Sequence, residues 1–140
     1  MLPIKGRVFI SVPAECYDAG VPVARRLAGV GFGLVATRGT GAHLRAAGLP
    51  AEHVNKVAEG SPHTVDLIRR GDVALVINTP SGAESFRDSF PIRRTALECR
   101  VPYFTTIAAA AAAAQAIELL ARGSLPVTAL QEHHRSVTGS

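Results

Sequence analysis

Short runs of consecutive apolar residues alternate along the chain with segments that have the spacing of amphipathic helices. The runs that predict strands lie at 7–12, 33–37, 73–78 and 102–106, and 54–57 is a further short edge candidate. A run that is apolar at successive positions is typical of a parallel strand, because helices cover both faces of a parallel sheet. Segment 73–78 is the strongest of these strand predictions.

Capping and stop residues predict helices between the strands. Asp18 is placed to cap a helix that ends at Val30 before Gly31, and Thr40 is placed to cap a short helix that ends at Ala47. Further helices are predicted from Ser61–Pro62 to Arg70, from Ser89–Pro91 to Cys99 and from Ala108 to Arg122. The helix that follows position 89 is expected to bury three apolar side chains, those of Ile92, Ala96 and Leu97.

Strands that alternate with helices predict a single α/β domain. We expect a Rossmann-like three-layer sandwich, in which a central, mostly parallel five-stranded sheet carries helices on both faces. The domain should span 1–140, with ordered structure over about 6–130 and a flexible tail at 131–140. Ligands of such sheets bind beyond the carboxyl ends of the strands, so the residues that follow each strand are the candidates for a site.

Composition narrows the range of partners. The 140 residues are 47% hydrophobic, which allows a core, and the formal net charge of +4 is too diffuse to indicate nucleic acid. No apolar segment approaches the roughly 20 residues of a membrane span, and none resembles a signal peptide. The two cysteines form neither a metal-binding spacing nor a disulfide framework, and the histidines form no zinc pattern. We therefore expect a cytoplasmic protein without a nucleic-acid, membrane or metal partner.

The residues after the second predicted strand have the composition of an anion-binding turn. The segment Thr37-Arg38-Gly39-Thr40-Gly41 leads into a helix. Glycines permit a tight turn, hydroxyl groups can donate hydrogen bonds, and a helix N-terminus presents unbonded amides. An ordinary threonine-capped turn is the alternative interpretation. The segment is neither a Walker A motif nor a GxGxxG motif, so the mononucleotide fingerprints do not apply.

A second polar segment, Asn78-Thr79-Pro80-Ser81-Gly82, follows the strongest predicted strand. It either contributes to a site at the strand ends or forms an Asx/Pro turn. No nucleophile–base pair stands out in the sequence, and Ser81 lacks the context of a nucleophile elbow. We therefore predict no catalytic residue.

Three more residues are placed near the same strand ends. Lys56 lies on the short edge segment and could pair with an anion, although a lone lysine is more often a solvated surface residue. Tyr103 and Thr105 alternate on the last strand, so both should point to one face of the sheet. A half-buried strand face is the alternative interpretation of that pair.

Three sequence blocks, at 54–63, 76–82 and 88–96, together resemble the methylglyoxal-synthase-like (MGS-like) domain family. Their characteristic elements are Asn-Lys-Val at 55–57, Asn-Thr-Pro-Ser-Gly at 78–82 and Ile-Arg-Arg at 92–94. The likeness extends in one register from about Gly6 to His133. The version that the chain resembles most ends the large subunit of carbamoyl phosphate synthetase.

The resemblance implies a regulatory domain that binds allosteric effectors: nucleotide monophosphates such as UMP or IMP, and in some members ornithine. The family's phosphate-binding positions fall in this sequence on Thr37, Thr40, Lys56 and Asn78, with Arg38, Gly39, Thr79 and Ser81 beside them. Positions that resemble the family's ornithine contacts fall on Tyr103 and Thr105.

The resemblance also implies partners. The parent synthetase uses ATP with Mg or Mn to make carbamoyl phosphate for pyrimidine and arginine biosynthesis, and no cofactor is implied for this domain itself. The implied partners are the rest of the large subunit, the glutaminase small subunit and a small-molecule effector.

Two positions depart from the family pattern. Tyr17 stands where the first loop of the nucleotide site often carries a lysine. Pro80 stands where the family has a threonine, which removes both a hydroxyl and a backbone N–H. A phosphate would therefore meet fewer donors than in the family pattern, and which effector binds stays open.

The same fold also hosts methylglyoxal synthase, a lyase that acts on dihydroxyacetone phosphate, which is the alternative function. That enzyme resembles the chain in its fold but needs an aspartate base after the Ser-Gly of the fourth strand, where this chain has Ala83-Glu84-Ser85. It also has a His-Asp pair in the first loop, where Pro13-Ala14 stands. Without a base, proton abstraction next to a carbonyl has no agent.

Overall fold

A computed structural model of the chain describes residues 6–55, 63–80 and 82–121. Within these residues five strands form one sheet in the order β3-β2-β1-β4-β5, and every neighbouring pair is parallel. The strands are β1 (Arg7–Ser11), β2 (Gly33–Ala36), β3 (Ala51–His53), β4 (Leu75–Asn78) and β5 (Tyr103–Phe104). The α/β class and the parallel five-stranded sheet that the apolar runs predict are confirmed.

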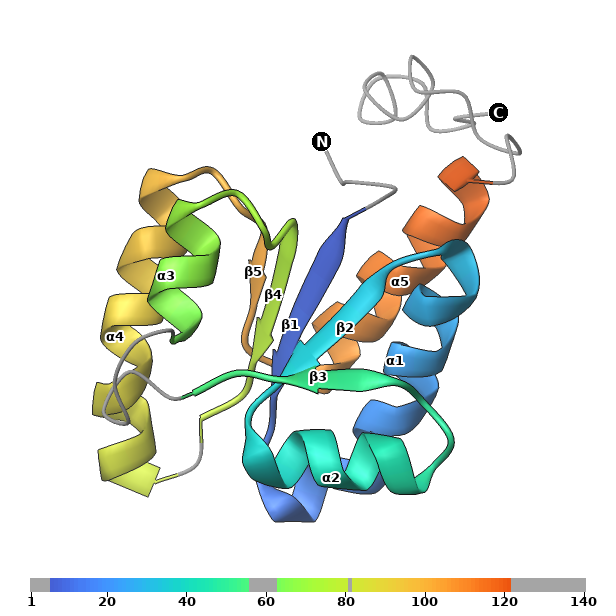
Figure 1. The fold of residues 1–140 in the computed structure, drawn as a ribbon, viewed down its shortest axis with the longest axis horizontal. Coiled ribbons are helices and arrows are strands. Elements are labelled where there is room, and N and C mark those ends of the chain that lie inside the picture. Colours follow the sequence, from blue (N-terminus) through green and yellow to red (C-terminus); the bar gives the residue numbers. More distant parts are fainter. Residues whose placement is uncertain (1–5, 56–62, 81, 122–140) are drawn as a thin grey trace.

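Helices cover both faces of this sheet and complete the three layers (Figure 1). They are η1 (Ala14–Cys16, a 3₁₀ turn), α1 (Tyr17–Val30), α2 (Arg38–Ala46), α3 (Thr64–Arg69), α4 (Gly82–Glu98) and α5 (Ile107–Ala121). Helices α1 and α5 pack on one face and α3 and α4 on the other, while α2 lies below the ends of the strands.

The core has two halves because side chains alternate along each strand. On β1, Val8 and Ile10 belong to the half that α1 and α5 cover, and Phe9 belongs to the half that α3 and α4 cover. The small side chains of α5, such as Ala110 and Ala114, are almost fully buried and let that helix approach the sheet closely.

The order of the strands reverses between β1 and β4. The chain proceeds outward from β1 through β2 to β3, then returns to the other side of β1 to form β4 and β5. The loops that leave β1 and β4 therefore diverge, which is where ligands bind in open parallel sheets. Ser11 pairs in register with Asn78, and Ile10 pairs with Ala36, so β1, β2 and β4 end at nearly the same level.

Two predicted helix caps are wrong, and in both cases a partner from another segment holds the predicted capping residue. Helix α1 begins at Tyr17, and the Asp18 carboxylate lies 3.3 Å from His43 Nε2 instead of capping the helix. Helix α2 begins at Arg38, so Thr40 lies in its first turn. The Thr40 hydroxyl bonds to the backbone of Val12, which follows β1.

The next two helices also begin at other residues than predicted. Helix α3 begins at Thr64, after a capping box in which the His63 ring accepts from the Asp66 N–H and Asp66 accepts from the His63 N–H. Of the predicted start, Ser61 and Pro62 lie outside the described residues. Helix α4 begins at Gly82 and contains Pro91. An internal proline removes a helical hydrogen bond, and burial of Ser89 and of residues beyond it retains the helix across that position.

Two smaller predictions also need correction. The edge strand is β3, which ends at His53, rather than 54–57; Asn55 forms only an isolated bridge with His63, and residues 56 and 57 lie outside the described residues. Ile92 and Ala96 are buried as predicted, but the Leu97 side chain is 68% exposed. Leu97 lies on the side of α4 that faces away from the sheet.

Candidate functional site

Polar side chains from four strands gather at the carboxyl edge of the sheet. Phe9, Val35 and Val76 all belong to the core half under α3 and α4. They stand two positions before Ser11, Thr37 and Asn78 respectively. By strand alternation these three polar side chains share that face, and Tyr103 packs against the same core half. The strand ends therefore bring together residues that are far apart in the sequence.

Two hydrogen bonds organise this group and leave donors unused. Thr37 Oγ1 lies 3.2 Å from Ser11 Oγ, and Asn78 Nδ2 donates to the Tyr103 hydroxyl at 3.0 Å. Thr37 and Asn78 are only 5% and 6% exposed. One of the two hydrogens of the hydroxyl pair, and one of the two hydrogens of the Asn78 amide, remain for a ligand.

Thr40 has a different role. Its hydroxyl accepts from the Val12 N–H at 3.1 Å and donates to the Val12 carbonyl at 3.2 Å, with the residue 4% exposed. A hydroxyl has one hydrogen, and Val12 holds it. Thr40 can therefore donate to a phosphate only if its bond to the Val12 carbonyl exchanges. Its evident function in this arrangement is to tie α2 to the end of β1.

Thr79 presents an unused donor. Its backbone N–H donates to the Ser11 carbonyl at 2.9 Å, which fixes the chain as it leaves β4. Its Oγ1 is buried and has no hydrogen-bond partner among the described residues. Leaving a buried hydroxyl unpaired costs about 1–3 kcal/mol, so this atom gains most from a partner that arrives later.

The first turn of α2 supplies backbone donors. Thr37 is the N-cap residue, and its side chain makes no capping bond to the helix. The amides of the first turn are the groups that helix N-termini offer to anions. Arg38 and Gly39 are exposed in this turn, and a Cβ added at Gly39 would overlap the Tyr17 hydroxyl. Glycine is therefore required at 39 as long as Tyr17 keeps its position.

His43, which itself contacts Asp18, holds Tyr17 beside this turn. The Tyr17 ring stacks on the His43 ring, with centroids 5.0 Å apart and planes inclined by 30°. His43 in turn contacts the Asp18 carboxylate.

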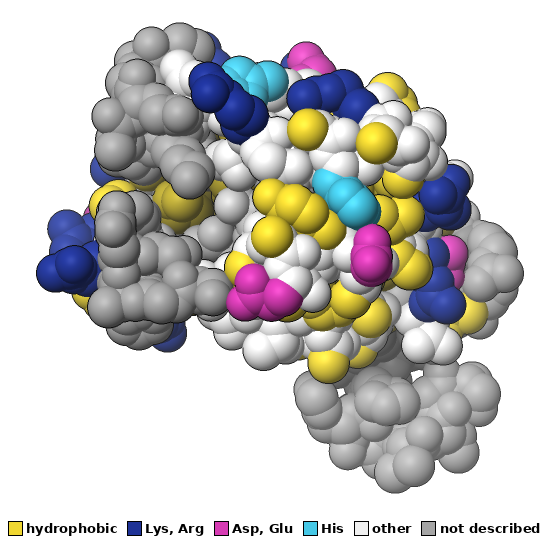
Figure 2. Space-filling model, turned by 90° about the horizontal axis from the view of Figure 1, so that it is seen from below, with side chains coloured by type: hydrophobic (Ala, Val, Ile, Leu, Met, Phe, Trp, Pro, Cys, Tyr) yellow, Lys and Arg dark blue, Asp and Glu magenta, His cyan; other side chains and the backbone are white. Residues whose placement is uncertain are grey.

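Figure 2 views the carboxyl edge directly. Over its described part, hydrophobic, acidic and histidine side chains occupy the middle, while Lys and Arg lie toward the rim. The described donors at the centre are thus mainly hydroxyls, one amide and backbone N–H groups.

The structure brings most of the predicted site residues to one edge. Thr37, Thr40, Asn78, Thr79 and Tyr103 lie at or just after strand ends, and Arg38 and Gly39 lie in the first turn of α2. Thr105 is exposed beyond the end of β5. Lys56 and Ser81 lie outside the described residues, so their predicted roles stay predictions.

Sequence reasoning missed Ser11 and the contact between Tyr17 and His43. Ser11 ends the first apolar run, and the rule that selects residues after each strand could have found it. The ring contact joins α1 to α2, and no local pattern signals it. Within the described ranges, no group of three potential ligands could hold a metal ion, and none of the helices there is long and apolar enough to cross a membrane.

Comparison with known proteins places this fold and site in context. The family described as MGS-like domain matches residues 19–105. The carbamoyl phosphate synthase large chain of Methanothrix thermoacetophila is 51% identical over 136 residues, which are 97% of this chain and 13% of that protein. The carbamoyl phosphate synthase large chain, C-terminal section, of Methanopyrus kandleri is 50% identical over 135 residues, 96% of this chain and 25% of that protein.

Among solved structures, methylglyoxal synthase from Elizabethkingia anophelis NUHP1 superposes with a TM-score of 0.63. The match covers 84% of this chain and 79% of the other, at 18% sequence identity. At that identity the likeness supports the fold alone. Of the length of the two synthase large chains to which it is similar, the chain spans only 13% and 25%.

Proposed function

The chain belongs to the MGS-like domain family, and we propose on that basis that it is an effector-binding regulatory domain of a carbamoyl phosphate synthase large chain. The observation that carries the proposal is the 51% identity to such a large chain across 97% of this sequence. Identity at that level along the whole segment supports a shared role, where the fold alone would not.

The proposed effector site is the carboxyl edge at the point where the strand order reverses. An anionic group would take the amides of the first turn of α2 and the spare hydroxyl hydrogen of the Ser11–Thr37 pair. The rest of the effector would extend toward Asn78 and Thr79, which have an unused amide hydrogen and an unpaired hydroxyl. Lys56 and Ser81 are proposed to complete the site.

We propose a nucleotide monophosphate, such as UMP or IMP, as the effector class. A phosphate suits the N-terminus of α2, whose first-turn amides are unbonded. The hydroxyl groups of a ribose suit the neutral donors of Asn78 and Thr79 at the end of β4. Tyr103 and Thr105 are proposed to serve a second, ornithine-like effector at the β5 end of the same edge. In the parent enzyme, the proposed partners are the rest of the large chain and a glutaminase small subunit in the cytoplasm. ATP and Mg or Mn would bind outside this domain, and the regulated product would feed pyrimidine and arginine biosynthesis.

Isothermal titration calorimetry of the chain with UMP, IMP and ornithine tests this proposal. We expect saturable heat with at least one nucleotide, and at least about tenfold weaker binding in Asn78→Asp, because that change exchanges an amide donor for a negative charge. Gln115→Glu makes the same chemical change at an exposed position on α5 and should leave the affinity unchanged. Lys56→Ala should also weaken binding. Absence of heat with every nucleotide would refute the nucleotide part of the proposal.

Methylglyoxal synthase activity is the second candidate, because a synthase of that kind has the same fold. The pattern of this chain opposes it, since the Ser81-Gly82 pair is followed by Ala83-Glu84-Ser85 where that enzyme has its aspartate, and the first loop has Pro13-Ala14. Incubation with dihydroxyacetone phosphate should therefore give no methylglyoxal. Turnover that disappears in Glu84→Ala would establish the lyase instead.

A further inference from the structure

The outer face of α4 exposes more large apolar surface than any other described part of the chain. The exposed large hydrophobic residues of the described chain are Phe90, at 47%, and Leu97, at 68%, and both lie on α4. They stand at i and i+7, about two turns apart, so they lie on the same side of the helix. The buried Ile92 and Ala96 lie on the opposite side, against the core.

Arginines flank this apolar pair. Each residue of an α-helix advances the chain by about 100° around the helix axis. Arg93 therefore lies to one side of the line between Phe90 and Leu97, and Arg87 and Arg94 lie to the other side. All three are exposed, and none makes an ion pair with another described residue. Arg69 of α3 takes the Glu98 carboxylate at 3.8 Å, which leaves α4 without a described free acid on this side.

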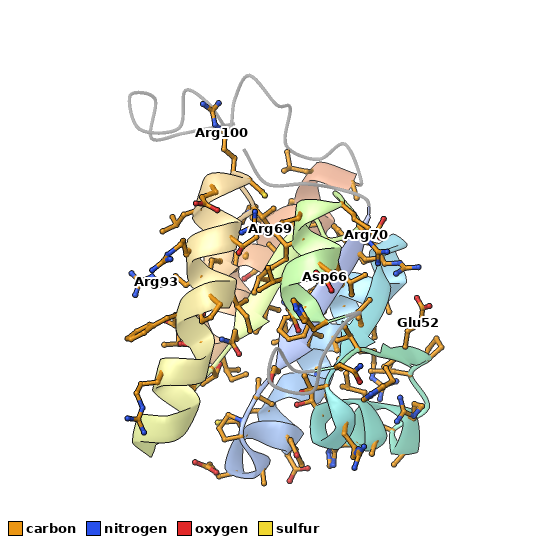
Figure 3. The ribbon with its side chains drawn as sticks, turned by 60° about the vertical axis from the view of Figure 1, so that its left-hand side comes forward. Glu52, Asp66, Arg69, Arg70, Arg93 and Arg100 are labelled. Carbon is orange, nitrogen blue, oxygen red and sulfur yellow. The ribbon has the colours of Figure 1, made fainter. Side chains whose placement is uncertain are left out.

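Figure 3 shows how these arginines lie. Arg93 extends away from the body of the domain, and Arg100 projects beyond the end of α4, while Arg69 lies between α3 and α4. Arg100 has a backbone φ of 57°, the left-handed conformation that commonly ends a helix. The face defined by Phe90, Arg93, Arg94 and Leu97, with Arg87 and Arg100 at its ends, is called the α4 face below.

We propose that the α4 face docks this domain on an acidic surface of the remaining carbamoyl phosphate synthase large chain. The inference rests on the proposed function and names its contact with that partner. Arginine and aromatic side chains are enriched at the centres of protein interfaces, and guanidinium groups pair with carboxylates in a bidentate geometry. The partner surface should therefore carry carboxylates around a shallow apolar depression that receives Leu97.

A second copy of the chain is a poorer occupant. A two-fold contact brings the same patch of each copy together, which would place the arginines of one α4 face against those of the other. Like charges in contact oppose association. The synthase relatives offer a better occupant, because the matching segment is only 13% and 25% of their length.

Helix α4 also connects the α4 face to the proposed effector site. It begins at Gly82, close behind Asn78 and Thr79 at the end of β4. An effector that repositions the segment after β4 would therefore act on the start of the same helix that docks. This places the proposed effector site and the proposed partner contact at two parts of one helix, and packed secondary elements are among the structures that carry coupling between sites.

Binding between this chain and the large chain of the same organism's synthase, prepared without this domain, tests the proposal by calorimetry. The double variant Arg93→Glu/Arg94→Glu should weaken binding at least about tenfold, and Leu97→Ala about fivefold. The matched control is Arg25→Glu/Arg26→Glu, an adjacent pair of exposed arginines on α1, and it should change the affinity less than about twofold. Unfolding midpoints of the α4 variants should match the wild type, since their substituted side chains are exposed. The control variant loses the hydrogen bond from Arg25 to the Ala47 carbonyl and the ion pair between Arg26 and Glu118, so a slightly lower midpoint is expected for it.

The outcomes separate this inference from the proposed function. Wild-type binding that both α4 variants retain would overturn the α4 face while leaving the regulatory domain intact. Nucleotide binding without any association with the large chain would do the same. Sedimentation that shows a dimer lost in Leu97→Ala would assign the face to a second copy and overturn the proposal. Loss of docking in both α4 variants, with nucleotide affinity unchanged, is the expected result.

Discussion

The two sides of the carboxyl edge use similar residues for different purposes. On the α2 side, the Thr40 hydroxyl has both its hydrogen and an acceptor site engaged by the backbone of Val12. On the β4 side, the Thr79 hydroxyl is buried and has no partner within the part of the chain that the structure describes. Both threonines follow a strand in the sequence, so position alone does not tell them apart.

The difference teaches how a ligand site can be built on a parallel sheet. One side ties a helix to the sheet and so fixes the direction of its N-terminal amides. The other side holds donors that the fold itself does not use, on Asn78 and Thr79. An effector would then gain hydrogen bonds mainly on the β4 side and electrostatic stabilisation on the α2 side.

The largest effect on stability should come from Thr40→Val. The change keeps the shape of the side chain but leaves the N–H and the carbonyl of Val12 without their partner, at a cost of about 3 kcal/mol in the free energy of unfolding. Urea titration followed by circular dichroism measures this. Thr105→Val, at an exposed position, is the matched control and should change the free energy by less than about 0.5 kcal/mol. Equal stability of the two variants would contradict the tie between α2 and β1.

A smaller loss is expected for Tyr103→Phe. It removes the acceptor for Asn78 Nδ2, and a part-buried bond of this kind is worth about 1 kcal/mol. The same urea titration measures the loss. The variant should also free the second hydrogen of the Asn78 amide, so affinity for a nucleotide should hold or rise. A drop in nucleotide affinity would show that Tyr103 itself contacts the nucleotide.

The Tyr17–Gly39 contact makes a coupled prediction. Gly39→Ala should destabilise the chain by about 1 kcal/mol, because the new methyl group displaces the Tyr17 ring from His43. The same change in a Tyr17→Phe background should cost clearly less, since the nearest remaining ring atom then lies 3.5 Å from the added carbon. A double-mutant cycle measures the coupling. Additive effects would mean that the hydroxyl does not restrict position 39.

The smallest effect should come from Thr79→Val, which applies the same substitution as Thr40→Val on the other side of the edge. No hydrogen bond is lost, so the free energy of unfolding should stay within about 0.5 kcal/mol or rise. Nucleotide affinity should fall, because the unpaired hydroxyl is a proposed contact. Loss of stability comparable to that of Thr40→Val would erase the difference between the two sides.

The apolar runs at 7–12, 33–37, 73–78 and 102–106 were sufficient to predict four of the five strands, but the edge strand β3 lies before the segment 54–57 that was expected to form it. The rule of strand ends was sufficient to predict where polar residues meet. Segment 73–78 contains β4, and Asn78 and Thr79 lie at its carboxyl end as expected. The start of each helix was harder to predict, because tertiary partners override local caps. Asp18 contacts His43 and Thr40 contacts Val12, and neither partner is close in sequence.

The exposed side chain of Leu97 marks another limit of sequence reasoning. Helical spacing placed it near the buried Ile92 and Ala96, yet it lies toward solvent among arginines. The expectation that apolar residues turn inward has exceptions, because apolar atoms contribute more than half of a folded protein's accessible surface. The α4 face is therefore a feature that only the folded chain reveals.

The most direct test of the central claim, that the carboxyl edge binds an anionic nucleotide, is a titration of the ¹⁵N-labelled chain with UMP followed by amide NMR shifts. The expected result is saturable shifts confined to residues 37–41 and 78–79 and their neighbours, with Arg25, Arg26 and Glu118 unaffected. Those three residues line a groove between α1 and α5, on a different part of the surface. Shifts that cluster in that groove, or no saturable shift at the carboxyl edge, would contradict the claim.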